Sequence, residues 1–580
     1  MVDDIILNYY GMNYIKKFTL LLVSTFIAFG FLSSQTKENQ PTNYISKVWV
    51  ADNGDGTYNN PILHADYSDP DAIRVGDDYY MTASSFNQVP GLPILHSKDL
   101  VNWTIIGNVF LHQPPYVRYD SVVHGGGVWA PAMRYHKGEF YIYYPDPDHG
   151  IWMVKTTNPA GPWSEPLLVK KSLGWIDPCP FWDEDGNAYL INGMAASRSG
   201  VKSTLILNRM SADGTRLLDN GVIVFDGHDK NPTVEGPKIH IRNGYYYILA
   251  PAGGVGTGWQ LALRSKNIYG PYEEKIVLEQ GNSTTNGPHQ GAWVETQIGE
   301  SWFIHFQDKD AYGRIVHLEP MKWVNNWPLI GVDIDGNGIG EPVLNYKKPN
   351  IGKTFPIQTP QESDEFNCNQ LGLQWQWAAN PKSNWAFPAG SAYGFIRMYN
   401  VPMQEGLTNM WNVPNLLTQK FPAPNFTVLT KFTFTARTEN EEAGLIIMGI
   451  DYSYLSLKKT ATGLVIYQSI CKNAEAGKPE TRSAEENVSS STVYFKVKVE
   501  NVEPASPDYK TFDTAECSKW GNASCTFSYS TDGKNYKQIG ESFAAKKGKW
   551  IGAKVGIFAL RKGKTYETGY ADFDWFRVEK

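Results

Sequence analysis

The chain has 580 residues, and 53 Lys and Arg residues face 59 Asp and Glu residues, so the formal net charge at pH 7 is only −6. This near-neutral charge excludes the basic surface of a typical nucleic-acid-binding protein, and 13% aromatic residues exclude a disordered chain. Gly and Pro make up about 15% of the residues, above the average near 12%. The composition predicts a turn-rich, mostly β protein with at least two domains.

The first 35 residues have the pattern of an export signal. Two lysines precede an apolar run over residues 18–32, and two serines follow the run. We predict that this signal peptide is cleaved and that residues 36–57 form an N-terminal extension. A transmembrane anchor is the alternative, although the run is shorter than the roughly 20 apolar residues that a span needs. The mature protein is then expected in the periplasm of a Gram-negative cell, or otherwise secreted, without membrane association.

One short unit recurs five times in the first half of the chain: a polar turn that ends in Gly, followed by aromatic and β-branched residues. The turn glycines are Gly76, Gly138, Gly186, Gly244 and Gly299, and they are 62, 48, 58 and 55 residues apart. Such turns between β-rich runs are typical of hairpins. Five units predict a five-bladed β-propeller over residues 58–350. The alternative is a β-sandwich with irregular loops, which the regular glycine spacing disfavours.

The second half of the chain has a different pattern. After a linker over residues 351–360, apolar and polar residues alternate, most clearly in residues 426–434, 494–499 and 571–578. This alternation predicts a β-sandwich over residues 361–580, making the whole protein all-β. We expect the tryptophans of this half to lie in the core, with a sugar-binding platform as the alternative; they include Trp375, Trp377 and Trp385.

A residue with functional potential precedes each turn glycine by seven to ten positions. These residues are Asp69, Trp129, Asp177, Glu235 and His289. If the opening strand of each blade lines the propeller axis, three carboxylates gather at one end of it. Crowded carboxylates cannot all stay ionised, so one pKa rises, and that acid can protonate a leaving group while another carboxylate activates water. This is the chemistry of glycoside hydrolysis, although the Asp-Pro and Glu-Gly-Pro motifs also suit simple turns.

The motifs around these positions together resemble glycoside hydrolase family 43 over residues 58–346. They are Asn60–Leu63, Asp69–Tyr80, Ser85–Phe86, Pro90–Trp103, Trp129–Pro131, Asp177–Pro178 and Glu235–Pro237. The second half resembles the β-sandwich that is appended to xylosidases and arabinofuranosidases of this family. The resemblance implies a five-bladed propeller with exo-acting, inverting β-xylosidase or α-L-arabinofuranosidase activity.

The resemblance also implies the roles of the three carboxylates. Asp69 matches the general base that activates water, and Glu235 matches the general acid. Asp177 matches the carboxylate that orients the acid and tunes its pKa. An inverting enzyme needs its base and acid carboxyl groups about 6.5–9.5 Å apart, which leaves room for one water.

The remaining site residues follow from the same resemblance. Arg314 matches a sugar-contacting arginine, and Phe86 and Trp129 match the pocket walls. His289 matches a substrate-binding histidine on the axis that in many members faces a metal, usually calcium, although the chemistry requires no cofactor. The chain departs from the family at Ala132, where many members have Asp, so the resemblance does not predict the pocket lining at this position.

The sugar is the least constrained part of the expectation. Residues 129–136 and 144–152 look more like family members that remove arabinose side chains. We therefore expect an α-L-arabinofuranosidase that acts on plant cell-wall oligosaccharides or polysaccharides of the arabinoxylan, xyloglucan or arabinan type. A β-1,4-xylosidase or a bifunctional enzyme is the alternative, and a non-catalytic sugar-binding propeller is a weaker one.

Overall fold

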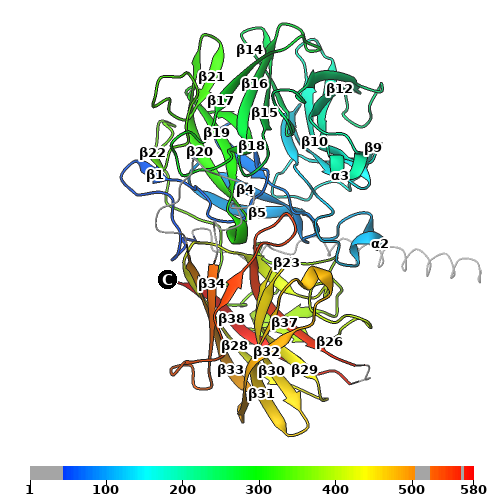
Figure 1. The fold of residues 1–580 in the computed structure, drawn as a ribbon, viewed down its shortest axis with the longest axis vertical. Coiled ribbons are helices and arrows are strands. Elements are labelled where there is room, and N and C mark those ends of the chain that lie inside the picture. Colours follow the sequence, from blue (N-terminus) through cyan, green and yellow to red (C-terminus); the bar gives the residue numbers. More distant parts are fainter. Residues whose placement is uncertain (1–43, 503–522, 564–566) are drawn as a thin grey trace, which may run out of the picture. The chain divides into compact units, whose positions relative to one another are not determined.

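The structure is a computed structural model that describes residues 44–502, 523–563 and 567–580 (Figure 1). These residues are almost entirely β-strands and turns. The predicted signal peptide lies outside the described residues. Within them, no helix combines the length and the apolar character that a membrane span requires.

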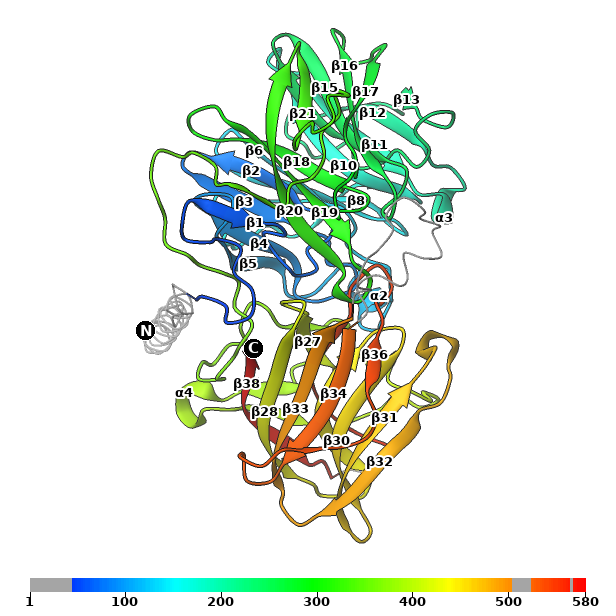
Figure 2. The same cartoon turned by 60° about the vertical axis from the view of Figure 1, so that its left-hand side comes forward.

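The first half folds into five four-stranded antiparallel sheets, which confirms the predicted five-bladed propeller (Figures 1 and 2). The sheets are β2–β5 (Asp71–Val75, Asp78–Thr82, Gly91–Ser97, Trp103–Phe110), β6–β9 (Ala132–His136, Glu139–Asp146, Gly150–Thr156, Leu167–Lys171), β10–β13 (Trp175–Trp182, Ala188–Met194, Thr204–Met210, Val222–Asp226), β14–β17 (Lys238–Arg242, Tyr245–Ala252, Trp259–Ser265, Glu273–Leu278) and β18–β21 (His289–Glu295, Ser301–Asp308, Arg314–Val324, Trp327–Ile330). Each repeat glycine lies in the hairpin between the first two strands of its blade. Gly76, for example, has φ = 63°, a left-handed conformation that favours glycine.

The two ends of the propeller are tied together next to its fifth blade. β1 (Thr57–Asn59) pairs antiparallel with β22 (Asn345–Lys347). The side chain of Asn60 then bonds both the carbonyl oxygen and the amide of Leu318 on β20, each at 2.8 Å. The hydroxyl of Tyr58 donates to the same carbonyl oxygen at 2.7 Å. These contacts fix the segment that leads into the first blade against the last blade of the propeller.

The second half forms two eight-stranded sheets that pack on one another, as the alternation predicted (Figure 2). One sheet contains β23 (Gln376–Trp377), β26 (Val401–Pro402), β27 (Leu417–Lys420), β29 (Glu441–Met448), β30 (Tyr452–Thr460), β31 (Gly463–Cys471), β32 (Thr481–Val488) and β37 (Lys554–Arg561). The other contains β24 (Ala386–Pro388), β25 (Ile396–Tyr399), β28 (Phe426–Thr435), β33 (Thr492–Asn501), β34 (Ala523–Ser530), β35 (Lys537–Gln538), β36 (Phe543–Ala545) and β38 (Tyr570–Glu579).

Aromatic side chains fill the space between these two sheets. Phe432 packs against Phe495 and Phe573 with ring centroids 5.1 and 4.8 Å apart. The three tryptophans singled out in the sequence are buried in the same core, so they pack the sandwich rather than form a sugar platform; they are Trp375, Trp377 and Trp385.

Backbone hydrogen bonds join the sandwich to the propeller. Val89 and Trp377 exchange two of them, and the amide of Ala553 donates to the carbonyl oxygen of Ala311 at 2.7 Å. The short helices α2 (Tyr116–Tyr119) and α3 (Ala196–Ser199) lie in propeller loops, and α4 (Gly390–Tyr393) lies in the sandwich. The 3-10 turns η1 (Asp310–Tyr312) and η2 (Ala474–Ala476) complete the described elements. Residues 546–553, which connect β36 to β37, thus reach the last blade of the propeller.

Candidate active site

The three predicted carboxylates lie at the openings of three blades. Asp69 lies two residues before β2, Asp177 lies in β10, and Glu235 lies three residues before β14. Asp69 and Asp177 have φ values of 54° and 56°, and the register of β10 shifts around Asp177, between Ile176 and Cys179. A non-glycine residue in the left-handed region is uncommon, and such strain and bulges cluster at functional sites. The backbone is therefore bent at the residues that display these carboxylates.

Two serines and one arginine hold the carboxylate of Asp69. The hydroxyls of Ser68 and Ser84 donate to Oδ2 at 2.9 and 2.6 Å. The guanidinium of Arg314, at the start of β20, donates to Oδ1 at 3.0 Å. Asp69 is 5% exposed, so this carboxylate is oriented by protein groups rather than by bulk water. The repeat pattern pointed to Asp69, but it held no signal for Ser84, which lies between the first two hairpin strands and the next strand of the blade.

Asp177 contacts the backbone beside Glu235. Its Oδ2 accepts a hydrogen bond from the amide of Gly236 at 2.7 Å and one from the side chain of Gln290 at 3.3 Å. Burial raises the pKa of Asp177 to about 6; the buried ammonium of Lys238 opposes this shift, and the charge of Asp69 adds to it. Asp177 therefore holds the backbone segment that carries Glu235, and its negative charge raises the pKa of Glu235.

Glu235 has the most strongly shifted carboxyl group of the three. Burial raises its pKa to about 8, and the negative charges of Asp177 and Asp69 add to the rise, against Arg314 and Lys202. Its carboxyl group therefore carries a proton at neutral pH, as a general acid must. Among the described residues, no hydrogen bond joins the carboxyl groups of Glu235 and Asp69, so the two groups do not bind each other.

His289 lies beside Glu235, at the start of β18. Its Nε2 is 3.5 Å from Oε1 of Glu235, and burial lowers its pKa to about 3, so the ring is neutral. Calcium prefers six to eight oxygen ligands, and the histidine offers one nitrogen next to a carboxyl group that has to stay protonated. These two side chains alone therefore do not provide the oxygen ligands of a calcium site, although both ring nitrogens of the buried His289 lack a hydrogen-bond partner.

A second group of possible metal ligands is buried within the last blade. It consists of His305, His317 and Glu319, whose ligand atoms lie within 4.8 Å of one another. One oxygen of Glu319 already meets His305 Nε2 at 3.2 Å, and the other accepts the amide of Val343 at 2.8 Å. The carboxylate thus has structural hydrogen-bond partners in the fold of the blade.

Aromatic side chains form the wall of the candidate site. The rings of Phe86 and Trp129 are 6.4 Å apart, and the guanidinium of Arg198 from α3 lies 5.3 Å from the Trp129 ring. Trp550 of the sandwich contacts Trp129 edge-on at 5.8 Å and lies 5.7 Å from the guanidinium of Arg314. Ala132, where the chain departs from the family pattern, is fully buried in a hydrophobic cluster of the propeller.

The sequence revealed the propeller side of this wall but not the sandwich side. Phe86, Trp129, His289 and Arg314 are all brought together with the three carboxylates by the contacts described above. Trp550 lies in the segment Gly548–Gly552, which has no counterpart in the blade repeat. In the sequence, only the two glycines of this segment indicated that the loop approaches another backbone closely.

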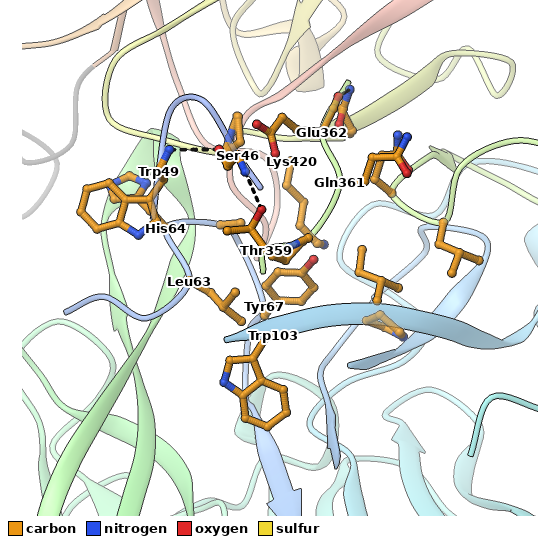
Figure 3. Close-up of a pocket in the computed structure, with 18 of the residues that line it drawn as sticks. Ser46, Trp49, Leu63, His64, Tyr67, Trp103, Thr359, Gln361, Glu362 and Lys420 are labelled. Atoms are coloured by element: carbon orange, nitrogen blue, oxygen red, sulfur yellow. Dashed lines mark hydrogen bonds between the residues drawn. The ribbon is translucent and has the colours of Figure 1, made fainter. Parts of the chain in front are cut away.

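A separate cavity of about 70 Å³ lies where the propeller, the linker and the sandwich meet (Figure 3). Its lining includes His64, Tyr67, Glu362 and Lys420, and Figure 3 shows Lys420 reaching toward Tyr67. None of the predicted catalytic or wall residues lines it. It is therefore distinct from the site that the carboxylates form.

Taken together, the arrangement offers one protonated carboxyl group, one oriented carboxylate and one cation within an aromatic wall. A protonated carboxyl group can donate to a glycosidic oxygen, and a fixed carboxylate can accept a proton from water. The guanidinium of Arg314 can also donate to a sugar hydroxyl, since it has five N–H groups.

Comparisons with known proteins agree with this chemistry. Residues 58–328 match the family model for glycosyl hydrolases family 43, and residues 363–579 match the β-xylosidase C-terminal concanavalin A-like domain. The chain is 41% identical over 517 residues to a protein of Xylanibacter ruminicola that is named as a candidate β-xylosidase, covering 88% of each chain.

Two further relatives carry different activity names. A β-xylosidase of Formosa agariphila is 32% identical and is matched over 98% of both chains. A non-reducing end α-L-arabinofuranosidase of Bacteroides ovatus is 30% identical over 69% of this chain and 75% of its own. With its propeller, its sandwich and its carboxylate centre, the chain belongs to glycoside hydrolase family 43.

Proposed function

We propose that this protein is an exo-acting, inverting β-xylosidase that removes xylose from the non-reducing end of xylo-oligosaccharides. The observation that carries the proposal is the pairing of Glu235, whose pKa burial raises to about 8, with the carboxylate of Asp69, which Arg314 orients. One group is set to donate a proton while the other can accept one, as an inverting glycosidase needs.

In the proposed mechanism, Asp69 removes a proton from a water molecule that attacks the anomeric carbon. Glu235 donates its proton to the glycosidic oxygen as the bond to the leaving sugar breaks. Asp177 holds the amide of Gly236 at 2.7 Å, and its charge keeps the pKa of Glu235 high. After turnover the proton on Asp69 must leave and Glu235 must regain one, which restores the starting state.

The choice of xylose rests on the named relatives. The two relatives with the highest identity described above carry β-xylosidase names, and they are matched over 88% and 98% of this chain. The sequence motifs favoured arabinofuranose instead, and the relative from Bacteroides ovatus keeps α-L-arabinofuranosidase as the second candidate. Plant hemicellulose, which presents both sugars, is the substrate class that suits either activity.

The proposal is tested with matched 4-nitrophenyl β-D-xyloside and α-L-arabinofuranoside. We expect kcat/KM for the xyloside to exceed that for the arabinofuranoside by at least about tenfold, a difference of about 1.4 kcal/mol in transition-state binding. A reversed preference would replace the proposal with the second candidate, and equal values would show a bifunctional enzyme.

Xylopentaose distinguishes exo from endo action. An exo-enzyme first produces equal amounts of xylose and xylotetraose from it, whereas cleavage of an internal bond produces xylobiose and xylotriose. Accumulation of longer fragments from xylan, with a rapid fall in viscosity, would contradict an exo mode. Glu235→Gln serves as the inactive control because it retains the size of the side chain and loses the proton to donate.

A further inference from the structure

One buried carboxylate outside the catalytic set connects the propeller to the sandwich. Asp66 lies three residues before Asp69 and is 4% exposed. Its Oδ1 accepts the backbone amide of Arg314 at 2.9 Å, and its Oδ2 accepts the backbone amide of Gly552 at 2.9 Å. A single side chain thus holds the start of β20 in the propeller and the loop before β37 in the sandwich.

The backbones around this carboxylate are packed too closely to admit side chains. Gly313 has φ = 72°, and a Cβ atom on it would lie 2.5 Å from Cγ of Asp66. A Cβ atom on Gly552 would lie 2.7 Å from the amide nitrogen of Gly313. Contacts below 3.0 Å force a shift, so the sandwich loop lies directly on the turn that leads into Arg314.

Both segments held by Asp66 carry residues of the candidate active site. Arg314 bonds the carboxylate of Asp69 at 3.0 Å. Trp550, two residues before Gly552, contacts Trp129 at 5.8 Å. A displacement of either backbone segment would therefore move a side chain of the candidate active site.

One half-buried and one buried lysine of the sandwich lie within electrostatic reach of Asp66. They are Lys420 and Lys554; burial lowers the pKa of each, and the charge of Asp66 opposes that shift. Lys420 also lines the cavity at the junction, near Tyr67 (Figure 3). The carboxylate thus lies where the sandwich places two lysine side chains against the propeller.

We propose that Asp66 is a positioning residue that couples the sandwich loop to the general-base side of the active site. It acts through the two backbone amides that it binds, and so it sets the positions of Arg314 and Trp550 together. The proposal rests on the proposed glycosidase function for its kinetic consequences, whereas its structural consequence can be measured without substrate.

The kinetic test compares Asp66→Asn with Asp99→Asn. Asp99 is the control, because it is also buried and accepts the backbone amides of Val101 and Asn102 at 3.0 and 2.8 Å. It also forms an ion pair with Lys348 at 2.8 Å, and none of its partners among the described residues is a catalytic residue. We expect Asp66→Asn to lower kcat/KM on 4-nitrophenyl β-D-xyloside by about 10–100-fold, since misplacement by 1 Å can cost that much. Asp99→Asn should leave kcat/KM on the same substrate within about twofold of the wild-type value.

A double-mutant cycle tests whether Asp66 acts through Trp550. If it does, adding Trp550→Ala to Asp66→Asn lowers kcat/KM by far less than Trp550→Ala does alone. Fully additive effects, or equal losses in the two aspartate variants, would overturn the coupling.

Hydrogen exchange of peptide amides gives a readout independent of activity. Asp66→Asn should speed exchange in both residues 311–315 and residues 548–553, and Asp99→Asn should leave both segments unchanged. Unchanged exchange in Asp66→Asn would refute the proposal even if activity fell. A wild-type protein inactive on both nitrophenyl glycosides would refute the proposed function alone, because the exchange result would still decide the role of Asp66.

Discussion

The propeller and the sandwich contribute to the candidate site in different ways. The propeller supplies the titratable groups, at equivalent positions of repeated blades, and its burial shifts their pKa values. The sandwich supplies Trp550 through one loop outside any repeat, and the propeller side chain of Asp66 binds the amide of Gly552 in this loop. The catalytic carboxyl groups thus follow the sequence repeat of the blades, whereas the shape of the pocket also depends on a contact between the two domains.

Removal of a catalytic carboxyl group should have the largest effect. We expect Asp69→Asn and Glu235→Gln each to lower kcat on xylobiose by about 10²–10⁴-fold, the usual contribution of a general acid or base. Nitrophenolate leaves without needing a proton, so Glu235→Gln should lose much less activity on the aryl glycoside than on xylobiose. Asp69→Asn should lose activity equally on both, because every substrate needs the activated water. Equal behaviour of the two variants on both substrates would mean that the roles are not divided as proposed.

Removal of the sandwich contribution should have a smaller effect, mainly on binding. Trp550→Ala should lower kcat/KM by about tenfold, since an aromatic contact contributes about 0.5–1.5 kcal/mol beyond the area that it buries. We expect this loss to appear as a higher KM. Phe387→Ala is the matched control, because Phe387 is an exposed aromatic residue on β24 of the same domain. A fall in kcat with unchanged KM would place Trp550 in the chemistry instead.

The pH dependence of kcat/KM should distinguish the role of Glu235 from the role of Asp177. Glu235 must be protonated to act, so kcat/KM should fall as the pH rises through about 8. The charge of Asp177 raises the pKa of Glu235, so Asp177→Asn should move this alkaline limb to lower pH. Trp550→Ala should leave the limb in place because it removes no charge. A limb that stays fixed in Asp177→Asn would show that another group sets it.

The smallest expected effect is on stability. A carboxyl group whose folded-state pKa lies above its unfolded value stabilises the fold when protonated, and this contribution is lost as the pH rises toward the folded pKa. For Glu235 the window runs from the ordinary pKa of 4.5 to the raised pKa of about 8. Glu235→Gln should therefore raise the Tm relative to the wild type at pH 8, by a few °C. At pH 4 the two Tm values should agree, and a difference independent of pH would exclude this cause.

The sequence allowed the carboxylates to be placed because the propeller repeats. Each turn glycine marks a hairpin, and counting back from it reached Asp69, Asp177 and Glu235 without any structure. The bulge at Asp177 and the serine contact at Ser84 were not predictable, since both depend on how the strands pair. The roles of Asp66 and Trp550 depend on contacts across about 250 to 490 residues of chain, for which local patterns hold no information.

The anomeric configuration of the first sugar released tests the central account most directly. Proton NMR early in the hydrolysis of 4-nitrophenyl β-D-xyloside, whose leaving group is not a sugar, shows the released xylose before it mutarotates. If Asp69 activates water while Glu235 protonates the leaving oxygen, the β-linked substrate yields α-xylose first. Initial release of β-xylose would contradict the account, because it would require a carboxylate that attacks the sugar directly.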